Sequence, residues 1–121
     1  MYQYYFEKLD VWKLSIDLSL KIYKLTEAFP SDERFGLTSQ LRRAITSVPT
    51  NLTEGLSRDS FKDQARFTTI AYGSLMEVLN LLIISYKLNY FEEKTYLELR
   101  TIINEVSNKI NALKKSQLKR I

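Results

Sequence analysis

The sequence predicts an all-α fold: an antiparallel up-down-up-down four-helix bundle that forms a single domain over residues 1–121. Three observations indicate this fold. The chain has only three Gly and two Pro and is rich in Leu, Ile, Lys and Glu, a composition that favours helices. Apolar residues recur at steps of three and four along four long segments. Short connections join these segments, so that sequential antiparallel packing is the simplest topology.

The first helix is expected from Asp10, as its N-cap, to about Ala28. The pair Phe29-Pro30 ends it, because the residue before a proline disfavours the α conformation. Its apolar residues form two neighbouring rows, a core row and a second row. The core row is Val11, Leu14, Leu18, Ile22 and Leu25, and the second is Trp12, Ile16 and Tyr23. This arc is wider than one helix–helix seam requires.

The second helix, residues 37–58, has an apolar face and a polar face. The apolar residues are Leu41, Ala44, Ile45, Val48 and Leu52, and the polar ones are Gln40, Arg43, Ser47, Asn51, Glu54 and Arg58. Pro49 interrupts the backbone hydrogen bonding and predicts a kink. Gly55 is expected to stop the helix. A hydroxyl or amide of Thr46, Ser47 or Asn51 is expected to help satisfy the carbonyl that Pro49 leaves free, either directly or through water.

The third helix is expected from about Ser60 to Leu88, with Ser60 as its N-cap and Asp63 in the first turn. Between Val78 and Ile84 only Asn80 is polar, so this helix requires apolar partners on two sides and predicts self-association. The residues expected at the oligomer interface are Trp12, Ile16, Tyr23, Phe67, Ile70, Leu81 and Ile84. Gly73, beside Ala71 and Ser74, predicts a close helix–helix approach.

The fourth helix follows a turn at Asn89, a residue that tolerates the left-handed conformation of a helix C-cap. Glu92 and Glu93 favour its positive N-terminal end. Its near-heptad apolar row is Tyr96, Leu99, Ile103, Val106, Ile110 and Leu113. Beyond Lys114 the pattern fades, so the last residues are expected to fray.

The polar line of the second helix has three interpretations. The preferred one is a polar network between the second and third helices, comprising Gln40, Arg43, Ser47, Asn51, Glu54, Ser74 and Glu77. The second is a phosphate- or partner-binding site built on Arg42, Arg43 and Arg58. The third and weakest is a carboxylate pair, Glu54 and Glu77, that acts in hydrolysis or binds a divalent metal.

Positive charge is concentrated in the C-terminal segment. Residues 1–108 carry thirteen Lys or Arg and fourteen Asp or Glu, whereas residues 109–121 carry five Lys or Arg and no acid. Such a segment suits either phosphate contacts or the negative end of a helix dipole. The candidate nucleic-acid-binding residues are Arg42, Arg43, Arg58, Lys109, Lys114, Lys115, Lys119 and Arg120.

The absence of Cys and His excludes disulfides, zinc sites and histidine bases. No catalytic constellation is present, so the sequence predicts a protein that is not an enzyme and has no metal, cofactor or small-molecule substrate. Without a signal peptide or a long apolar run, a cytoplasmic location without membrane insertion is expected. The residues Tyr2, Tyr4, Tyr5 and Phe6 suit either a subunit contact or stacking on unpaired bases.

Five segments together form a distinctive set of motifs: LDVWK at 9–13, FP at 29–30, GLTSQLRRA at 36–44, SVPTNLTEG at 47–55 and AYGSLMEV at 71–78. In this order they resemble the four-helix-bundle proteins encoded in intervening sequences of bacterial 23S ribosomal RNA. The matching motif positions are Trp12, Pro30, Gln40, Arg42, Arg43, Ser47, Pro49, Asn51, Glu54, Gly55, Gly73, Ser74 and Glu77. The resemblance implies an antiparallel bundle and a homo-oligomer, with a pentamer favoured. Related accessory proteins of diversity-generating retroelements are basic pentamers that bind nucleic acid and a reverse transcriptase.

Two functions follow as hypotheses. In the first, a non-catalytic homo-oligomer binds RNA or a ribonucleoprotein partner through basic side chains of the assembled ring. In the second, the protein is a self-assembling scaffold or protein-interaction module with no nucleic-acid role. The first 108 residues are not cationic, unlike the basic relatives, so the first hypothesis depends mainly on the C-terminal segment.

Overall fold

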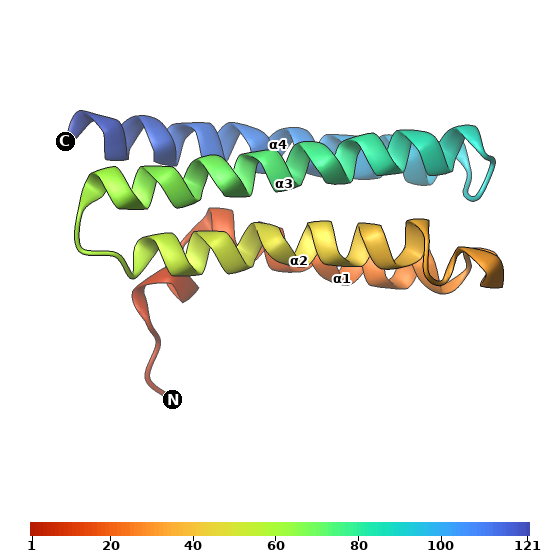
Figure 1. The fold of residues 1–121 in the computed structure, drawn as a ribbon, viewed down its shortest axis with the longest axis horizontal. Coiled ribbons are helices and arrows are strands. Elements are labelled where there is room, and N and C mark those ends of the chain that lie inside the picture. The colour runs from red at the N-terminus through yellow and green to blue at the C-terminus, as the bar shows by residue number, and fades with distance from the viewer.

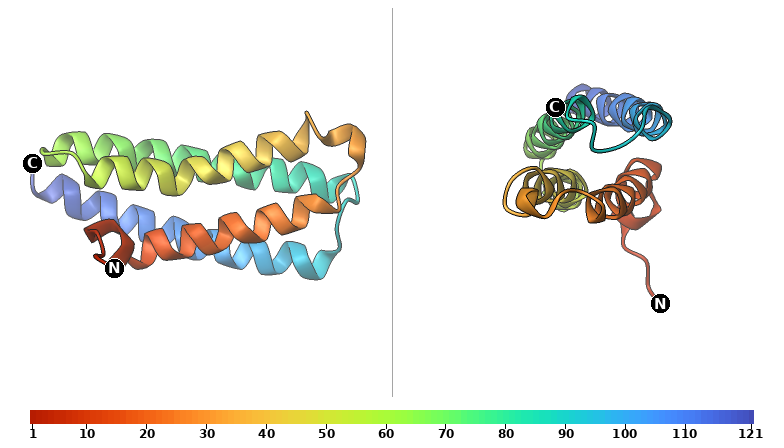
Figure 2. Two further views of the ribbon diagram at one scale, coloured as in Figure 1. Left: turned by 90° about the horizontal axis from the view of Figure 1, so that it is seen from below. Right: turned by 90° about the vertical axis from the view of Figure 1, so that its right-hand side faces the viewer.

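The computed structural model describes residues 1–121 as four long helices with two short 3-10 turns. The helices are α1 (Asp10–Glu27), α2 (Leu37–Leu56), α3 (Phe61–Lys87) and α4 (Glu93–Lys119), and the turns are η1 (Tyr5–Lys8) and η2 (Ser31–Glu33). Helices α1 and α2 form one layer, and α3 and α4 form the other (Figures 1 and 2). Each helix packs against two others and not against the one diagonally opposite. The predicted all-α up-and-down arrangement is confirmed.

The core runs along the axis of the bundle and is made by the apolar rows that the sequence predicted. Its fully buried side chains are Leu18 and Ile22 from α1, Leu41, Ile45, Val48 and Leu52 from α2, Leu75, Val78 and Leu82 from α3, and Val106 and Ile110 from α4. All four helices contribute, so burial of these side chains fixes the rotation of each helix about its own axis.

Helix α3 is apolar on two sides because it packs against both α2 and α4 within one chain. Phe67 and Leu81, expected at an oligomer interface, are 7% and 6% exposed, so the expectation for these two residues is wrong. Ile70, Ile84 and Tyr23 remain 42%, 40% and 41% exposed. Trp12 and Ile16 are half-buried beside a groove between α1 and α2. The single chain therefore covers part of the expected interface and leaves the rest accessible.

Helix α3 is also the one helix long and apolar enough, by length and composition, to cross a membrane. Its apolar side chains meet α2 and α4 along the bundle. The core helix of a globular bundle meets the same criteria, so these properties are accounted for by packing.

The helix ends agree with the sequence at two positions and differ at one. Ser60 caps α3, because its Oγ accepts a hydrogen bond of 3.1 Å from the N–H of Asp63. Asn89 has φ 63°, the left-handed conformation expected after α3. The expectation that Asp10 caps α1 is wrong: Leu9 is the N-cap residue and Asp10 is the first residue of the helix.

Two further expectations about helix ends are corrected. Helix α2 continues through Gly55 to Leu56, so Gly55 does not stop it. Helix α4 continues to Lys119, beyond the point at which its apolar pattern was expected to fade. Gln117, 3% exposed, extends the buried row of α4 by one more turn.

The two glycines of the α2–α3 pair have opposite surroundings. A Cβ at Gly55 would lie 2.7 Å from the Cβ of Phe67, so α2 and α3 approach closely there. A Cβ at Gly73 would meet no atom within 4 Å. The close approach expected at Gly73 is therefore absent within one chain and occurs at Gly55 instead.

An aromatic cluster closes the bundle where η2 meets the α3–α4 connection. Phe29 packs against Tyr90 and Phe91, and the rings of Tyr86 and Tyr96 stack with centroids 4.1 Å apart. The hydroxyl of Tyr90 donates a hydrogen bond of 2.7 Å to Glu33 Oε2. That bond, with desolvation and nearby negative charge, raises the pKa of Tyr90 above its ordinary value. This end of the molecule lies opposite the two chain termini (Figure 1).

Candidate nucleic-acid interface

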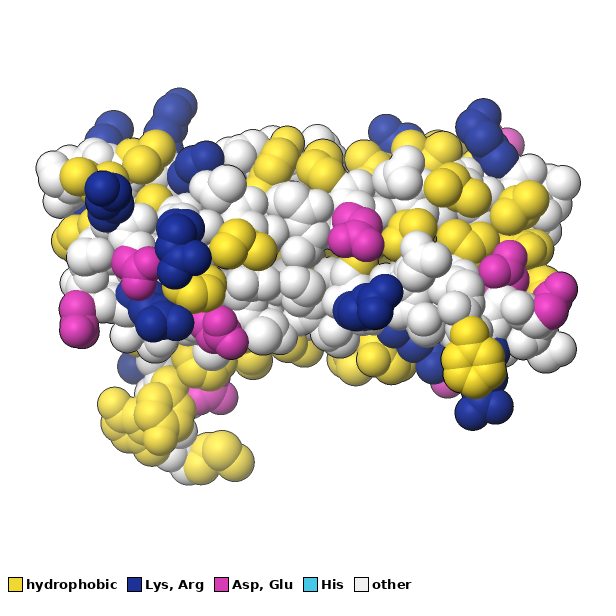
Figure 3. Space-filling model, in the orientation of Figure 1, with side chains coloured by type: hydrophobic (Ala, Val, Ile, Leu, Met, Phe, Trp, Pro, Cys, Tyr) yellow, Lys and Arg dark blue, Asp and Glu magenta, His cyan; other side chains and the backbone are white.

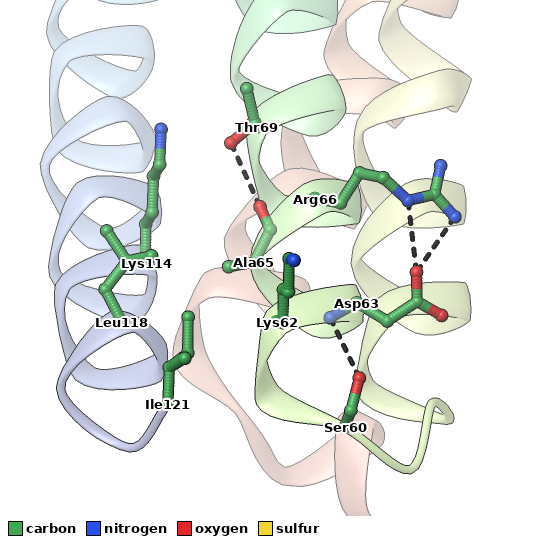
Figure 4. A pocket seen from close by; sticks show the side chains of 9 residues that line it. All are labelled: Ser60, Lys62, Asp63, Ala65, Arg66, Thr69, Lys114, Leu118 and Ile121. Atoms are coloured by element: carbon green, nitrogen blue, oxygen red, sulfur yellow. Dashed lines mark hydrogen bonds and ion pairs between the residues drawn. The ribbon is translucent and has the colours of Figure 1, made fainter.

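The start of α3 and the end of α4 lie side by side and enclose an open groove of about 640 Å³. Figure 4 shows the side chains of α4 opposite those of α3 across this groove. Its lining residues are Ser60, Lys62, Asp63, Ala65, Arg66, Thr69, Lys114, Leu118 and Ile121. Its apolar lining residues are Ala65, Leu118 and Ile121, and its cationic ones are Lys62, Arg66 and Lys114. Lys114 is one of the expected tail cations, whereas Lys62 and Arg66 were not among the predicted site residues.

Positive charge is concentrated at this end of the molecule. Residues 58–66 and 109–121 together carry eight Lys or Arg and two Asp, a net charge of +6, whereas the rest of the chain has a net charge of −2. Lys and Arg side chains gather over the end of the molecule where α3 begins and α4 ends (Figure 3). We name residues 58–66 and 109–121 the cationic end.

Two arginines of the cationic end already have partners within the chain. Asp63 pairs with Arg66 at 3.0 Å and lies 3.7 Å from Arg58. Both guanidinium groups lie over the ring of Phe67, at 4.7 Å for Arg58 and 4.5 Å for Arg66. Arg58 and Arg66 thus cover Phe67 and pair with Asp63, which leaves the lysines and Arg120 without a carboxylate partner.

The remaining cations differ in their surroundings. Lys62, Lys115 and Lys119 are exposed, and Lys109 and Lys114 are half-buried. None of the five lysines lies in an ion pair. The Arg120 guanidinium lies 5.3 Å from the centre of the Phe61 ring. Five ammonium groups therefore have no carboxylate partner and are available to phosphates.

Arg42 and Arg43 do not belong to this interface. They lie on α2 thirteen or fourteen residues before its last residue, Leu56, roughly 20 Å along the helix, and Arg58 lies beyond that end. Arg42 instead joins α2 to α1: its Nε donates to Thr26 Oγ1 at 2.9 Å and its Nη2 donates to the carbonyl of Tyr23 at 3.2 Å. Its guanidinium also lies over the Tyr23 ring. The proposed site of Arg42, Arg43 and Arg58 is therefore not brought together.

The polar network between α2 and α3 is smaller than expected. The hydroxyls of Ser47 and Ser74 share a hydrogen bond of 2.8 Å, and Asn51 Nδ2 donates to the carbonyl and hydroxyl oxygens of Ser47. The expected members Gln40, Arg43, Glu54 and Glu77 are exposed and make no side-chain hydrogen bond or ion pair. No side chain donates to the carbonyl that Pro49 leaves free. The network therefore consists of Ser47, Asn51 and Ser74.

We expect Arg43→Ala to change the free energy of unfolding by less than about 0.5 kcal/mol, because the side chain is exposed and unpaired. Ser47→Ala is the matched comparison and removes the hydroxyl that joins Ser74 and Asn51. Its expected cost is about 0.5–1.5 kcal/mol. Urea denaturation measures both. A loss above about 1 kcal/mol for Arg43→Ala would restore this residue to the network.

One buried polar pair was not predicted from the sequence. Thr68 Oγ1 lies 2.8 Å from Gln117 Oε1, and both residues are almost fully buried. The amide nitrogen of Gln117 has no hydrogen-bond partner. Gln117 follows Ile110 and Leu113 at helical spacing, so the apolar periodicity of α4 was the signal that could have identified it.

The carboxylate pair of the weakest sequence hypothesis comes from two helices. Glu54 lies on α2 and Glu77 on α3, and both side chains are exposed. No group of three or more Asp or Glu side chains is placed to share a metal ion.

A family model described as 23S rRNA-intervening sequence protein matches residues 7–112. The chain belongs to this family. The chain is also similar to a solved structure of a protein with unknown function from the S23 ribosomal protein family of Bacteroides thetaiotaomicron. That structure has a TM-score of 0.80 and 20% sequence identity, and the similarity covers 87% of this chain and 95% of that chain. At this identity the likeness shows the fold alone. No curated protein matches the sequence.

The family match ends before the most cationic part of the chain. Four of its candidate nucleic-acid-binding residues lie beyond residue 112, namely Lys114, Lys115, Lys119 and Arg120. Membership of the family therefore accounts for the bundle but not for the charge at its end.

Proposed function

We propose that this protein is a non-catalytic homo-oligomer that binds RNA, alone or in a ribonucleoprotein, through its cationic end. The observation that carries the proposal is the net charge of +6 on residues 58–66 and 109–121 in a chain whose remainder is slightly acidic. A phosphate backbone attracts such a surface, and the release of its counterions drives binding.

The arrangement of the lysines supports phosphate contacts rather than internal pairing. Lys62 and Lys114 line opposite walls of the groove, and neither has a carboxylate partner. A helix C-terminus alone would account for cations on the last turn of α4. It does not account for Lys62 on the first turn of α3, where the helix dipole disfavours a cation. Lys62 therefore favours an anionic ligand over the dipole explanation.

Self-association would strengthen the attraction between the cationic ends and RNA phosphates. Ile70 and Ile84 lie on α3 with about two fifths of their surface exposed, and Tyr23 is similarly exposed on α1. Burying them against further copies would remove apolar surface from water and bring several cationic ends together. The family resemblance favours a pentamer. Light scattering at micromolar protein concentration measures the mass directly, and a monomer would contradict this part of the proposal.

A salt titration of RNA affinity tests the proposal. The test variant replaces Lys114, Lys115 and Lys119 by Gln. The matched control makes the same change at Lys13, Lys21 and Lys24 of α1, which carry the same charge and are all exposed. We expect affinity for a structured RNA to fall steeply with salt. The slope of log affinity against log salt should decrease by about 2–3 in the test variant and stay unchanged in the control.

Two outcomes would contradict RNA binding at this site. Absence of binding at low salt would favour the alternative function, a self-assembling scaffold or protein-interaction module. Equal losses in the two lysine variants would mean that RNA responds to net charge alone and not to the cationic end. Fluorescence anisotropy of labelled RNA gives both measurements.

A further inference from the structure

Three exposed tyrosines precede η1 or begin it. Tyr2, Tyr4 and Tyr5 are 79%, 62% and 66% exposed, a high exposure for aromatic side chains in one short segment. The segment extends away from the α1–α2 layer and contributes nothing to the core (Figure 1). Core packing, which explains most of the other aromatic residues, does not explain these three.

The segment is held in a defined arrangement. The Tyr4 backbone N–H donates a hydrogen bond of 2.8 Å to Glu7 Oε2. The rings of Tyr2 and Tyr4 lie edge to face with centroids 5.2 Å apart, and the Phe6 ring packs on Trp12 of α1 at the same separation. Phe6 and Trp12 thus attach the base of the segment to the bundle, and the tyrosine rings are presented to solvent.

Tyr5, at the base of the segment, lies beside the cationic end. Tyr5 and Arg120 line the same cavity, about 340 Å³ in volume, together with Phe61 and Gln117. The Arg120 guanidinium also lies over the Phe61 ring. The segment that carries Tyr2 and Tyr4 therefore joins the bundle next to a cation of the cationic end.

We infer that the cationic end binds RNA as unpaired nucleotides, whose bases stack on Tyr2, Tyr4 and Tyr5 while the lysines contact the phosphates. This inference rests on the proposed function and specifies its ligand. Aromatic faces next to a cationic track are the combination that single-strand-binding proteins use, because every base offers a flat face. In a duplex those faces are covered by neighbouring base pairs, so exposed rings add affinity only for unpaired bases.

Two RNA forms and three variants test the inference by fluorescence anisotropy at one salt concentration. The RNAs are a short unstructured strand and the same strand annealed to its complement. The test variant replaces all three tyrosines by Ala, and the conservative variant replaces them by Phe. The control, Phe35→Ala, removes an aromatic side chain that is 87% exposed at the opposite end of the bundle.

The intact protein should bind the single strand more tightly than the duplex. The triple Ala variant should lose single-strand affinity by on the order of tenfold per ring, with little change for the duplex. The triple Phe variant and Phe35→Ala should retain the affinity of the intact protein. Retention by the Phe variant shows that stacking, and not hydroxyl hydrogen bonding, carries the effect.

Three results would overturn the inference, and they point to different causes. Equal affinity for single strand and duplex would leave RNA binding intact but remove the role of the unpaired bases. A change in sedimentation coefficient of the triple Ala variant without RNA would assign the tyrosines to a subunit contact. Failure of the intact protein to bind either RNA at low salt would overturn the proposed function as well.

Discussion

Truncation of Leu18 to alanine should lower the free energy of unfolding by about 2–5 kcal/mol. Leu18 has no exposed surface and lies in the middle of α1, which meets the rest of the bundle only through α2, α4 and η1. The substitution removes buried methyl groups and leaves a cavity that the surrounding helices close only in part. Urea denaturation followed by circular dichroism measures the change, and an unchanged m-value shows that the two-state transition is preserved.

Leu20→Ala is the matched control on the same helix. Leu20 is 65% exposed and lies two residues from Leu18, on nearly the opposite side of the helix. Its truncation should change the free energy of unfolding by less than about 0.5 kcal/mol. Comparable losses of stability for Leu18→Ala and Leu20→Ala would contradict the orientation of α1, in which Leu18 faces the core and Leu20 faces solvent. A loss for Leu20→Ala that grows with protein concentration would place this residue in a subunit contact.

The sequence predicted the helices well because helical periodicity and end signals are local. The row from Leu99 to Ile110 follows directly from spacing, and each of its members is buried. Ser60 and Asn89 mark helix ends by side-chain chemistry that does not depend on the rest of the fold. The prediction for Gly55 was wrong because glycine occurs both at helix ends and inside helices that approach each other closely. Only the position of α3 shows that Gly55 has the second role.

The candidate site was predicted only in part because its members come from distant segments. The cationic tail was evident from composition, but Lys62 and Arg66 join it only through the packing of α3 on α4. Arg42 and Arg43 are neighbours in sequence, yet they point roughly 100° apart on the helix. Arg42 therefore reaches the α1 carbonyl while Arg43 faces solvent. Sequence gives the angle between the two side chains but not which of them meets α1.

The oligomer expectation shows the same limit. Apolar residues on two sides of α3 predicted that two of its faces pack against other helices, and two of its faces do so. Both surfaces are supplied by α2 and α4 of the same chain, however, which is why Phe67 and Leu81 are already covered. Ile70 and Ile84 remain exposed, so the proposal of self-association depends on residues such as these.

The second large effect is expected at Gly55. Gly55→Ala should lower the free energy of unfolding by about 1–3 kcal/mol, although alanine favours a helix interior by ~1 kcal/mol over glycine. The added Cβ would lie 2.7 Å from the Cβ of Phe67 and 3.3 Å from the carbonyl oxygen of Gln64. Neither atom can rotate aside, because one is fixed to the backbone and the other belongs to it. Relief therefore requires α2 and α3 to separate.

Gly73→Ala is the matched control and has the opposite expected sign. Its Cβ would meet nothing within 4 Å, and no glycine has a positive φ, so the substitution should stabilise the chain by about 0.5–1 kcal/mol through helix propensity. Urea denaturation of both variants gives the two signs. Stabilisation by Gly55→Ala would contradict the close α2–α3 approach. Destabilisation by Gly73→Ala, with a fall in the mass measured by light scattering, would mean that another copy packs against this face of α3.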